Sequence, residues 1–111
     1  MVWQKAMDLV TLSYQVSRLL PKEERFGLAQ QIERSVVSVP SNIAEGHGRR
    51  HRGDFIHHLS IANGSVKELE TQLLISVRLG YVQENDIAMA MRLTDEIGKM
   101  LVSLHRKLQT K

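Results

Sequence analysis

The chain has 111 residues, of which 42% are hydrophobic and 24% charged, a size and balance typical of one globular domain. It contains no cysteine, which excludes disulfides and thiolate metal sites and is compatible with a reducing cytosol. No apolar run approaches the roughly 20 residues that span a bilayer, and the N-terminus lacks the apolar stretch of a secretory signal. We therefore expect a cytoplasmic protein, and its net charge of +3 matters only where that charge is concentrated.

Apolar residues recur every three or four positions along the first half of the chain, which is the period of an amphipathic helix. The first predicted helix covers residues 3–20. The second covers residues 21–45, with Pro21 in its first turn, where the missing amide hydrogen costs nothing. Pro40 lies inside this helix and predicts a kink or a short break, because it removes one backbone hydrogen bond. The side chains expected to face the core are Trp3, Met7, Leu9, Val10, Leu12, Tyr14, Val16, Leu19, Phe26, Leu28, Ala29, Ile32, Val36, Val39 and Ile43.

The second half of the chain predicts two more helices. The third begins at Asp54, as N-cap, and ends before Gly80, which suits a left-handed position after a helix. The fourth follows Gln83 or Asn85 and runs to the C-terminal residues. Four such helices joined by short turns predict an all-α, antiparallel up-down-up-down four-helix bundle, a single domain over residues 1–111. The core positions expected on these two helices are Phe55, Leu59, Ala62, Val66, Leu69, Leu73, Ile87, Ala90, Thr94, Ile97, Leu101, Leu104 and Leu108.

The third and fourth helices also carry apolar residues beside their main stripes. A broad core-facing stripe is one explanation, since bundle helices usually have one. A second apolar face used for self-association is the other. Both readings stay open for Ile56, Ile61, Ile75, Leu79, Met89, Leu93 and Met100.

Three segments of the sequence resemble a known family. Residues 20–28 read Leu-Pro-Lys-Glu-Glu-Arg-Phe-Gly-Leu, residues 38–46 read Ser-Val-Pro-Ser-Asn-Ile-Ala-Glu-Gly, and residues 64–74 begin with Gly-Ser. They resemble the four-helix bundle proteins encoded in intervening sequences of bacterial 23S rRNA genes, and the accessory proteins of diversity-generating retroelements are similar. The resemblance covers nearly the whole chain. It departs from the expected pattern after Gly46, where an aromatic residue is usual, and at Asn63.

The resemblance implies a four-helix bundle that assembles with itself into a ring-shaped homo-oligomer, specifically a pentamer. It also implies the absence of enzymatic activity and of a cofactor. In the retroelement branch it implies binding to nucleic acid and to a reverse transcriptase.

A basic elbow, defined as residues 46–53, separates the second and third predicted helices. Its side chains Arg49, Arg50, His51 and Arg52 can present forked donors to phosphate, and a ring would repeat them around its circumference. The alternative is a solvated loop whose charges only aid solubility. No phenylalanine, tyrosine or tryptophan lies within the elbow, so binding should follow charge and shape rather than base sequence. The C-terminal residues that would extend this field, or form a solvated face, are Lys99, Arg106, Lys107 and Lys111.

Histidines in and near the elbow invite a metal interpretation. His47 and His51 are four residues apart, a spacing that can share a zinc ion on a helix. Gly48 argues against helix between them, and the neighbouring arginines would repel a divalent cation. We therefore expect no metal, and we expect the histidines to add positive charge as the pH falls.

Acidic residues of the second and third helices are the candidates for chemistry. Antiparallel helices could bring Glu45 near Glu68 as an acid/base pair, but no activated nucleophile is placed beside them. We expect buried hydrogen bonds around the Pro40 kink instead, and a capping box of Asn42 and Glu45 if the helix restarts there. Gly64 should admit the close approach of a neighbouring helix. The residues with expected structural roles are Pro40, Ser41, Asn42, Glu45, Gly64, Ser65 and Glu68.

These features predict a non-enzymatic, oligomeric bundle that binds RNA or DNA without sequence specificity through the basic elbow. The alternative is a protein-interaction adaptor without nucleic-acid binding. A third hypothesis is a small hydrolase or metal protein built on the acids and histidines around the elbow.

Overall fold

The computed structural model describes residues 1–109 and consists of four long α-helices and one short 3-10 helix. The helices are α1 (Val2–Ser17), α2 (Leu28–His47), α3 (Arg52–Arg78) and α4 (Glu84–Gln109). The 3-10 helix η1 (Lys22–Glu24) lies in the connection between α1 and α2. No strand occurs within residues 1–109, so the all-α prediction is confirmed for that part of the chain.

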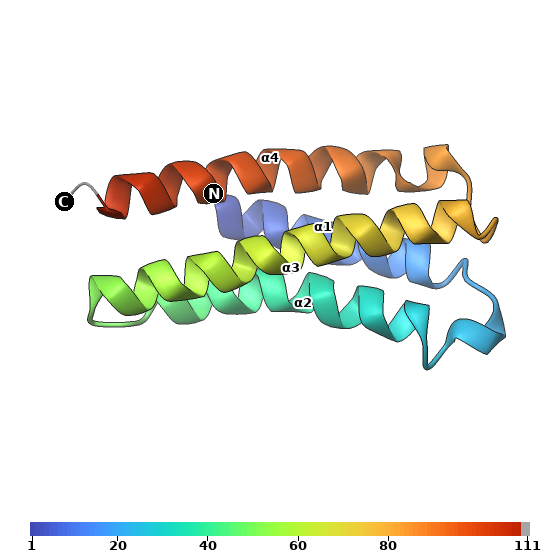
Figure 1. The fold of residues 1–111 in the computed structure, drawn as a ribbon, viewed down its shortest axis with the longest axis horizontal. Coiled ribbons are helices and arrows are strands. Elements are labelled where there is room, and N and C mark those ends of the chain that lie inside the picture. The colour runs from blue at the N-terminus through green and yellow to red at the C-terminus, as the bar shows by residue number, and fades with distance from the viewer. Residues whose placement is uncertain (110–111) are drawn as a thin grey trace.

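The helices form an elongated antiparallel bundle of 46 × 23 × 19 Å (Figure 1). Each helix packs against the next one in the chain, and α4 closes the bundle against α1. The most extensive of these interfaces joins α2 to α3. Within residues 1–109, none of the helices has the length and apolar character needed to cross a membrane.

The core is aliphatic, as the low aromatic content predicts, and every helix contributes to it. The helical period places most core residues correctly, because burial of one stripe per helix is what stabilises a bundle. The buried apolar side chains are Ala6, Leu9, Val16, Leu20, Leu28, Ala29, Ile32, Val36, Val39, Ile43, Leu59, Ala62, Val66, Leu69, Leu73, Val82, Ile87, Ala90, Ile97 and Leu101.

Four expected core residues are in fact exposed. Phe26 is 80% exposed and Leu19 55%, because both lie outside the helices and the helical register does not reach them. Trp3 and Met7 lie on α1, yet each remains 43% exposed. The predictions for Leu19 and Phe26 were wrong because α1 ends earlier and α2 begins later than expected. The predictions for Trp3 and Met7 were wrong about which face of α1 the other helices cover.

The second predicted helix begins seven residues later than expected. Pro21 precedes η1, and α2 itself begins only at Leu28, after Gly27. One carboxylate oxygen of Glu24 accepts a hydrogen bond from the Leu28 backbone N–H at 2.9 Å, which satisfies one of the unpaired donors of the first turn. Its other oxygen accepts the Tyr81 hydroxyl at 2.9 Å. Glu24 therefore ties the start of α2 to the turn between α3 and α4.

The helix ends in the second half differ from prediction at one position. Gly80 has a φ of 81°, so its predicted left-handed conformation is confirmed. Gln83 precedes α4, and its backbone N–H donates to the Asp86 carboxylate at 2.8 Å. Asp54 is not an N-cap, because α3 begins at Arg52 and places Asp54 in its first turn.

Replacing Glu24 should make the stability of the bundle less dependent on pH. The hydrogen bonds from Leu28 N–H and from Tyr81 lower the pKa of the Glu24 carboxyl below its ordinary value of 4.5, and the same contact raises the pKa of Tyr81. Because folding favours the ionised carboxylate, its stabilising effect is complete above pH 4.5 and is lost as the pH falls further. We expect Glu24→Gln to lower the melting temperature near neutral pH and to approach the wild type near pH 3.

The neighbouring exposed Glu23 provides the control, since Glu23→Gln removes the same charge from η1 without these hydrogen bonds. Thermal unfolding followed by circular dichroism measures both variants. A difference between Glu24→Gln and wild type that stays constant from pH 7 to pH 3 would contradict this role.

Candidate nucleic-acid interface

The basic elbow is shorter in the structure than in the prediction. Helix α2 continues to His47 and α3 begins at Arg52, so only residues 48–51 connect them. Helix α2 also runs through Pro40 without interruption, so the predicted break and restart are absent. The long α2–α3 interface outweighs the roughly 3 kcal/mol that an interior proline costs a helix.

Gly46 is the residue that allows α3 to approach α2 next to the elbow. A Cβ atom at this buried position would lie 2.8 Å from the His58 Cβ and 3.0 Å from the Phe55 Cδ1. Gly64, where the sequence predicted a close approach, is exposed, and a Cβ atom there would meet nothing within 4 Å. The close contact therefore exists, but it lies at Gly46, and the prediction for Gly64 was wrong within this chain.

The three elbow arginines differ in their partners. Arg49 donates to the Glu45 carboxylate at 2.6 Å, and the two side chains are 47% and 54% exposed. Arg50 and Arg52 are exposed and make no ion pair with any other residue of 1–109. None of the three guanidinium groups is enclosed by the protein, so all three can be reached from solvent.

One end of the bundle holds both the elbow and the C-terminal turns of α4 (Figure 1). We call it the basic end and define it as residues 45–58 and 102–109. It carries five arginines and lysines against two acids, a surplus of three that equals the formal charge of the whole chain. All five histidines of the sequence also lie here. The predicted site residues of the basic end are Arg49, Arg50, His51, Arg52, Arg106 and Lys107.

Lys99, another of the predicted C-terminal basic residues, does not extend this surface. Lys99 pairs with Asp95 at 3.2 Å, one turn earlier on α4. Lys111 lies outside the described residues.

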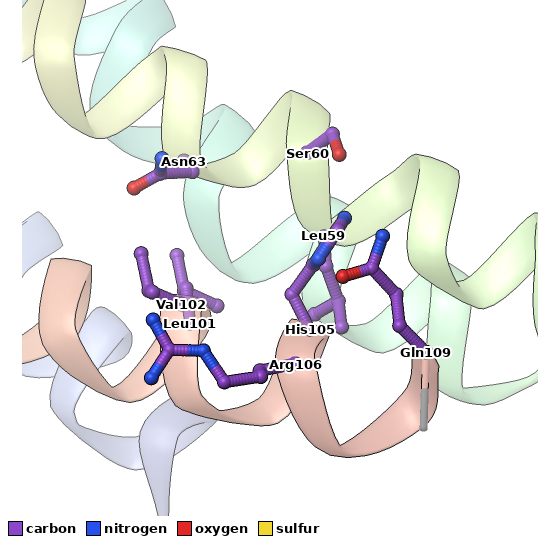
Figure 2. Close-up of a pocket in the computed structure, with 8 residues that line it drawn as sticks. All are labelled: Leu59, Ser60, Asn63, Leu101, Val102, His105, Arg106 and Gln109. Carbon is purple, nitrogen blue, oxygen red and sulfur yellow. The ribbon is translucent and has the colours of Figure 1, made fainter. Parts of the chain in front are cut away.

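A groove of about 320 Å³ separates α3 from α4 beside the basic end. Figure 2 shows Ser60 and Asn63 of α3 across the groove from Arg106 and Gln109 of α4. The Asn63 Oδ1 atom is buried behind the wall of the groove and has no hydrogen-bond partner among residues 1–109. Sequence reasoning placed Arg106 here only as part of a charge field, and it missed the groove because its two walls are about forty residues apart in the chain.

A polar network joins α2 to α3 around Pro40. The Asn42 Nδ2 donates to the Ser38 carbonyl at 2.8 Å and to its Oγ at 3.0 Å, and the Ser65 Oγ donates to the same Oγ at 2.8 Å. The Asn42 Oδ1 lies 3.0 Å from the His58 Nδ1. Since an amide oxygen only accepts, this His58 nitrogen carries the proton.

The predicted membership of this structural cluster is only partly right. Asn42 and Ser65 belong to it, but Ser41, Glu45 and Glu68 are exposed and make no buried hydrogen bond. Ser38 and His58 take their places. The helical period explains the difference, because Ser38 and Asn42 are four residues apart and face α3 together, whereas Ser41 and Glu45 face solvent.

The geometry does not assemble the catalytic or metal alternatives within the described residues. Glu68 is exposed, and Glu45 is engaged by Arg49 and lies 3.8 Å from the His58 Nε2. In residues 1–109, no group of three or more histidine or acidic side chains is arranged to hold a metal ion.

Comparison with known proteins gives the chain its family. The family model of the 23S rRNA-intervening sequence protein matches residues 1–103, which is almost the whole chain. The chain belongs to this family. This match confirms the family resemblance that the three sequence segments indicated.

A solved structure shows the same fold as this 23S rRNA-intervening sequence family member. It is a protein of unknown function from the S23 ribosomal protein family of Bacteroides thetaiotaomicron, with 27% sequence identity and a TM-score of 0.87. The match covers 95% of this chain and 98% of the other. No curated protein matches the sequence.

The two glycines of this family member give a paired test of the α2–α3 contact. Gly46→Ala should destabilise the bundle by about 1–3 kcal/mol, because His58 and Phe55 must shift to accommodate the new methyl group. Gly64→Ala should stabilise it by about 0.5–1 kcal/mol, because alanine has the higher helix propensity and the space is open. Urea unfolding measures both, and equal effects of the two substitutions would refute the assignment of the close contact to Gly46.

Proposed function

We propose that this protein is a non-catalytic, self-associating bundle that binds the phosphate backbone of RNA or DNA through its basic end. The observation that carries the proposal is the concentration of the entire net charge at this end. Binding of this kind has no base-sequence preference, because phosphate contacts do not distinguish bases. The proposal includes a cytoplasmic location, where both kinds of nucleic acid are accessible.

The arginines are suited to phosphate by their chemistry and their exposure. A guanidinium group offers two parallel donors that match two phosphate oxygens. Arg50 and Arg52 have no acidic partner to give up among residues 1–109. The Arg49–Glu45 pair is solvent-exposed, and such pairs contribute at most about 1 kcal/mol, so a phosphate can replace the carboxylate at low cost.

The family name supports RNA as the first nucleic acid to test. It names an intervening sequence of 23S rRNA without saying what the proteins bind, and RNA is a polyanion of the kind that a basic end would bind.

Self-association would multiply these contacts. Exposed apolar side chains occur along the outer faces of the bundle, and such surfaces usually mark interfaces. A ring, which the family resemblance implies to be a pentamer, would present five copies of the basic end to one strand. The exposed apolar residues available on α2, α3 and α4, and at Leu79 directly after α3, are Val37, Ile61, Leu74, Ile75, Leu79, Met89 and Val102.

A protein-interaction adaptor is the second candidate, and the same exposed apolar residues favour it. In that case they would bind a different polypeptide, such as a reverse transcriptase, and the basic end would only aid solubility. Nucleic-acid binding separates the two candidates.

Removing two arginines from the basic end should weaken binding and its dependence on salt. We expect Arg50→Gln/Arg52→Gln to reduce the affinity for a thirty-nucleotide single-stranded RNA severalfold. Each phosphate contact contributes about 0.7 to the slope of log affinity against log salt for single strands, so two lost contacts lower the slope by about 1.4 per subunit engaged. Fluorescence anisotropy between 50 and 200 mM salt measures both quantities.

The matched control is Arg34→Gln/Arg78→Gln, which removes the same charge from exposed positions outside the basic end. It should leave the affinity and the slope close to those of the wild type. Equal losses in the two double variants would reduce the proposal to a general charge effect, and no binding by the wild type would favour the adaptor.

The mass of the protein in solution tests self-association independently. A pentamer has a mass of about 63 kDa, five times the 12.6 kDa subunit. Light scattering after size-exclusion chromatography should give a multiple of the subunit mass, and a monomer at micromolar concentration would contradict the proposed assembly.

A further inference from the structure

At the basic end of the bundle, α1 reaches less far than the other three helices. Helix α1 has 16 residues, whereas α3 has 27 and α4 has 26. The Lys5 ammonium, near the start of α1, binds the Glu96 carboxylate at 2.8 Å, and α4 continues for thirteen residues beyond Glu96, about 20 Å at 1.5 Å per residue. Figure 1 shows the N-terminus of α1 set back from the end that α2, α3 and α4 reach.

An apolar hollow of about 410 Å³ lies beside the first residues of α1. Its volume is within the range of about 300–1,000 Å³ typical of sites for small organic groups. The residues at the start of α1 form one wall, and the ends of the other three helices form the rest. The lining residues are Met1, Val2, Trp3, Ile43, Ala44, His47, Phe55 and Leu104.

Three of the lining side chains are flat rings. His47 and Phe55 contact each other edge to face, with their centroids 5.9 Å apart and their planes at 73°. Trp3 is 43% exposed, so part of its indole surface is available to a ligand. The elbow sequence contains no phenylalanine, tyrosine or tryptophan, but folding brings Trp3 into the same hollow as His47 from more than forty residues away.

The elbow arginines are close in sequence to two of the residues that line the hollow. His47 lies two residues before Arg49, and Phe55 lies three residues after Arg52. The same end therefore combines an apolar, ring-lined hollow with the guanidinium groups of the short connection between α2 and α3. A base attached to a phosphate backbone has this combination of a flat apolar face and an adjacent anion.

We propose that the hollow binds an unpaired nucleobase of a single-stranded nucleic acid, whose phosphates are held by Arg50 and Arg52. The inference rests on the proposed function, since it needs the backbone to be bound at the basic end. The base stacks on Trp3 and on the His47–Phe55 pair, and it is sequence-tolerant because every base has a stacking face. A duplex cannot enter, because its bases are paired and stacked on one another.

The test compares two twelve-unit strands that carry the same phosphates. One is a thymidine oligonucleotide and the other is the abasic strand with the same backbone spacing. Base stacking is worth about 1–3 kcal/mol per base, so the thymidine strand should bind about 5- to 150-fold more tightly. Trp3 is the only tryptophan of the chain, so its fluorescence reports directly on the hollow and should be quenched by thymidine and not by the abasic strand.

Two variants locate the effect. Trp3→Leu keeps an apolar side chain but removes the ring, and it should bind the two strands with nearly equal affinity in anisotropy measurements. Phe26→Leu removes an aromatic ring that is 80% exposed, and it should retain the preference of the wild type. Phe26 belongs to the connection between α1 and α2, which lies at the opposite end of the bundle (Figure 1). Arg50→Gln/Arg52→Gln should weaken both strands together.

The outcomes separate this inference from the function on which it rests. Equal binding of the two strands by the wild type, without a change in tryptophan fluorescence, would overturn the base site and leave phosphate binding intact. Failure of both strands to bind would overturn the proposed function and the base site with it. Tryptophan fluorescence that responds to protein concentration but not to either strand would assign the hollow to a second copy of the chain.

Discussion

The arrangement of the basic end depends on how closely α3 approaches α2 at Gly46. A side chain at this position would collide with His58 and Phe55, so the absence of one sets the distance between the two helices. Four residues are then enough to join them, and the short connection holds the elbow arginines at the tip of the bundle. The hydrogen bonds that Asn42 accepts from His58 and that Ser38 accepts from Ser65 fix the same contact from inside the α2–α3 interface.

The four helices differ in length and do not reach equally far into the basic end. Helix α1 reaches less far toward this end than α2, α3 and α4 (Figure 1). A ring-lined hollow lies beside its first residues, at the same end of the bundle as the elbow arginines. Apolar surface and charge are therefore placed together, a combination that suits a ligand with a flat base and a phosphate.

The fold could be predicted from the sequence because its determinants are local. Apolar spacing of three and four identified all four helices and most of the core, and Gly80 marked the end of α3 by its conformational freedom. Phe26 and Gly64 were misjudged because burial depends on neighbours that spacing does not reveal. The candidate site was predicted only in part for the same reason. The arginines are adjacent in sequence and were found, whereas only the fold places Trp3 in one hollow with His47 and Phe55.

The central claim is that the basic end, and no other part of the surface, receives the nucleic acid. Amide NMR spectra of isotope-labelled protein, recorded with and without a twelve-nucleotide single strand, test it most directly. The account predicts that chemical shift changes are confined to residues 1–5, 45–58 and 102–109 and include the single indole N–H of Trp3. Changes centred on η1 and the α3–α4 turn, at the opposite end, would contradict it.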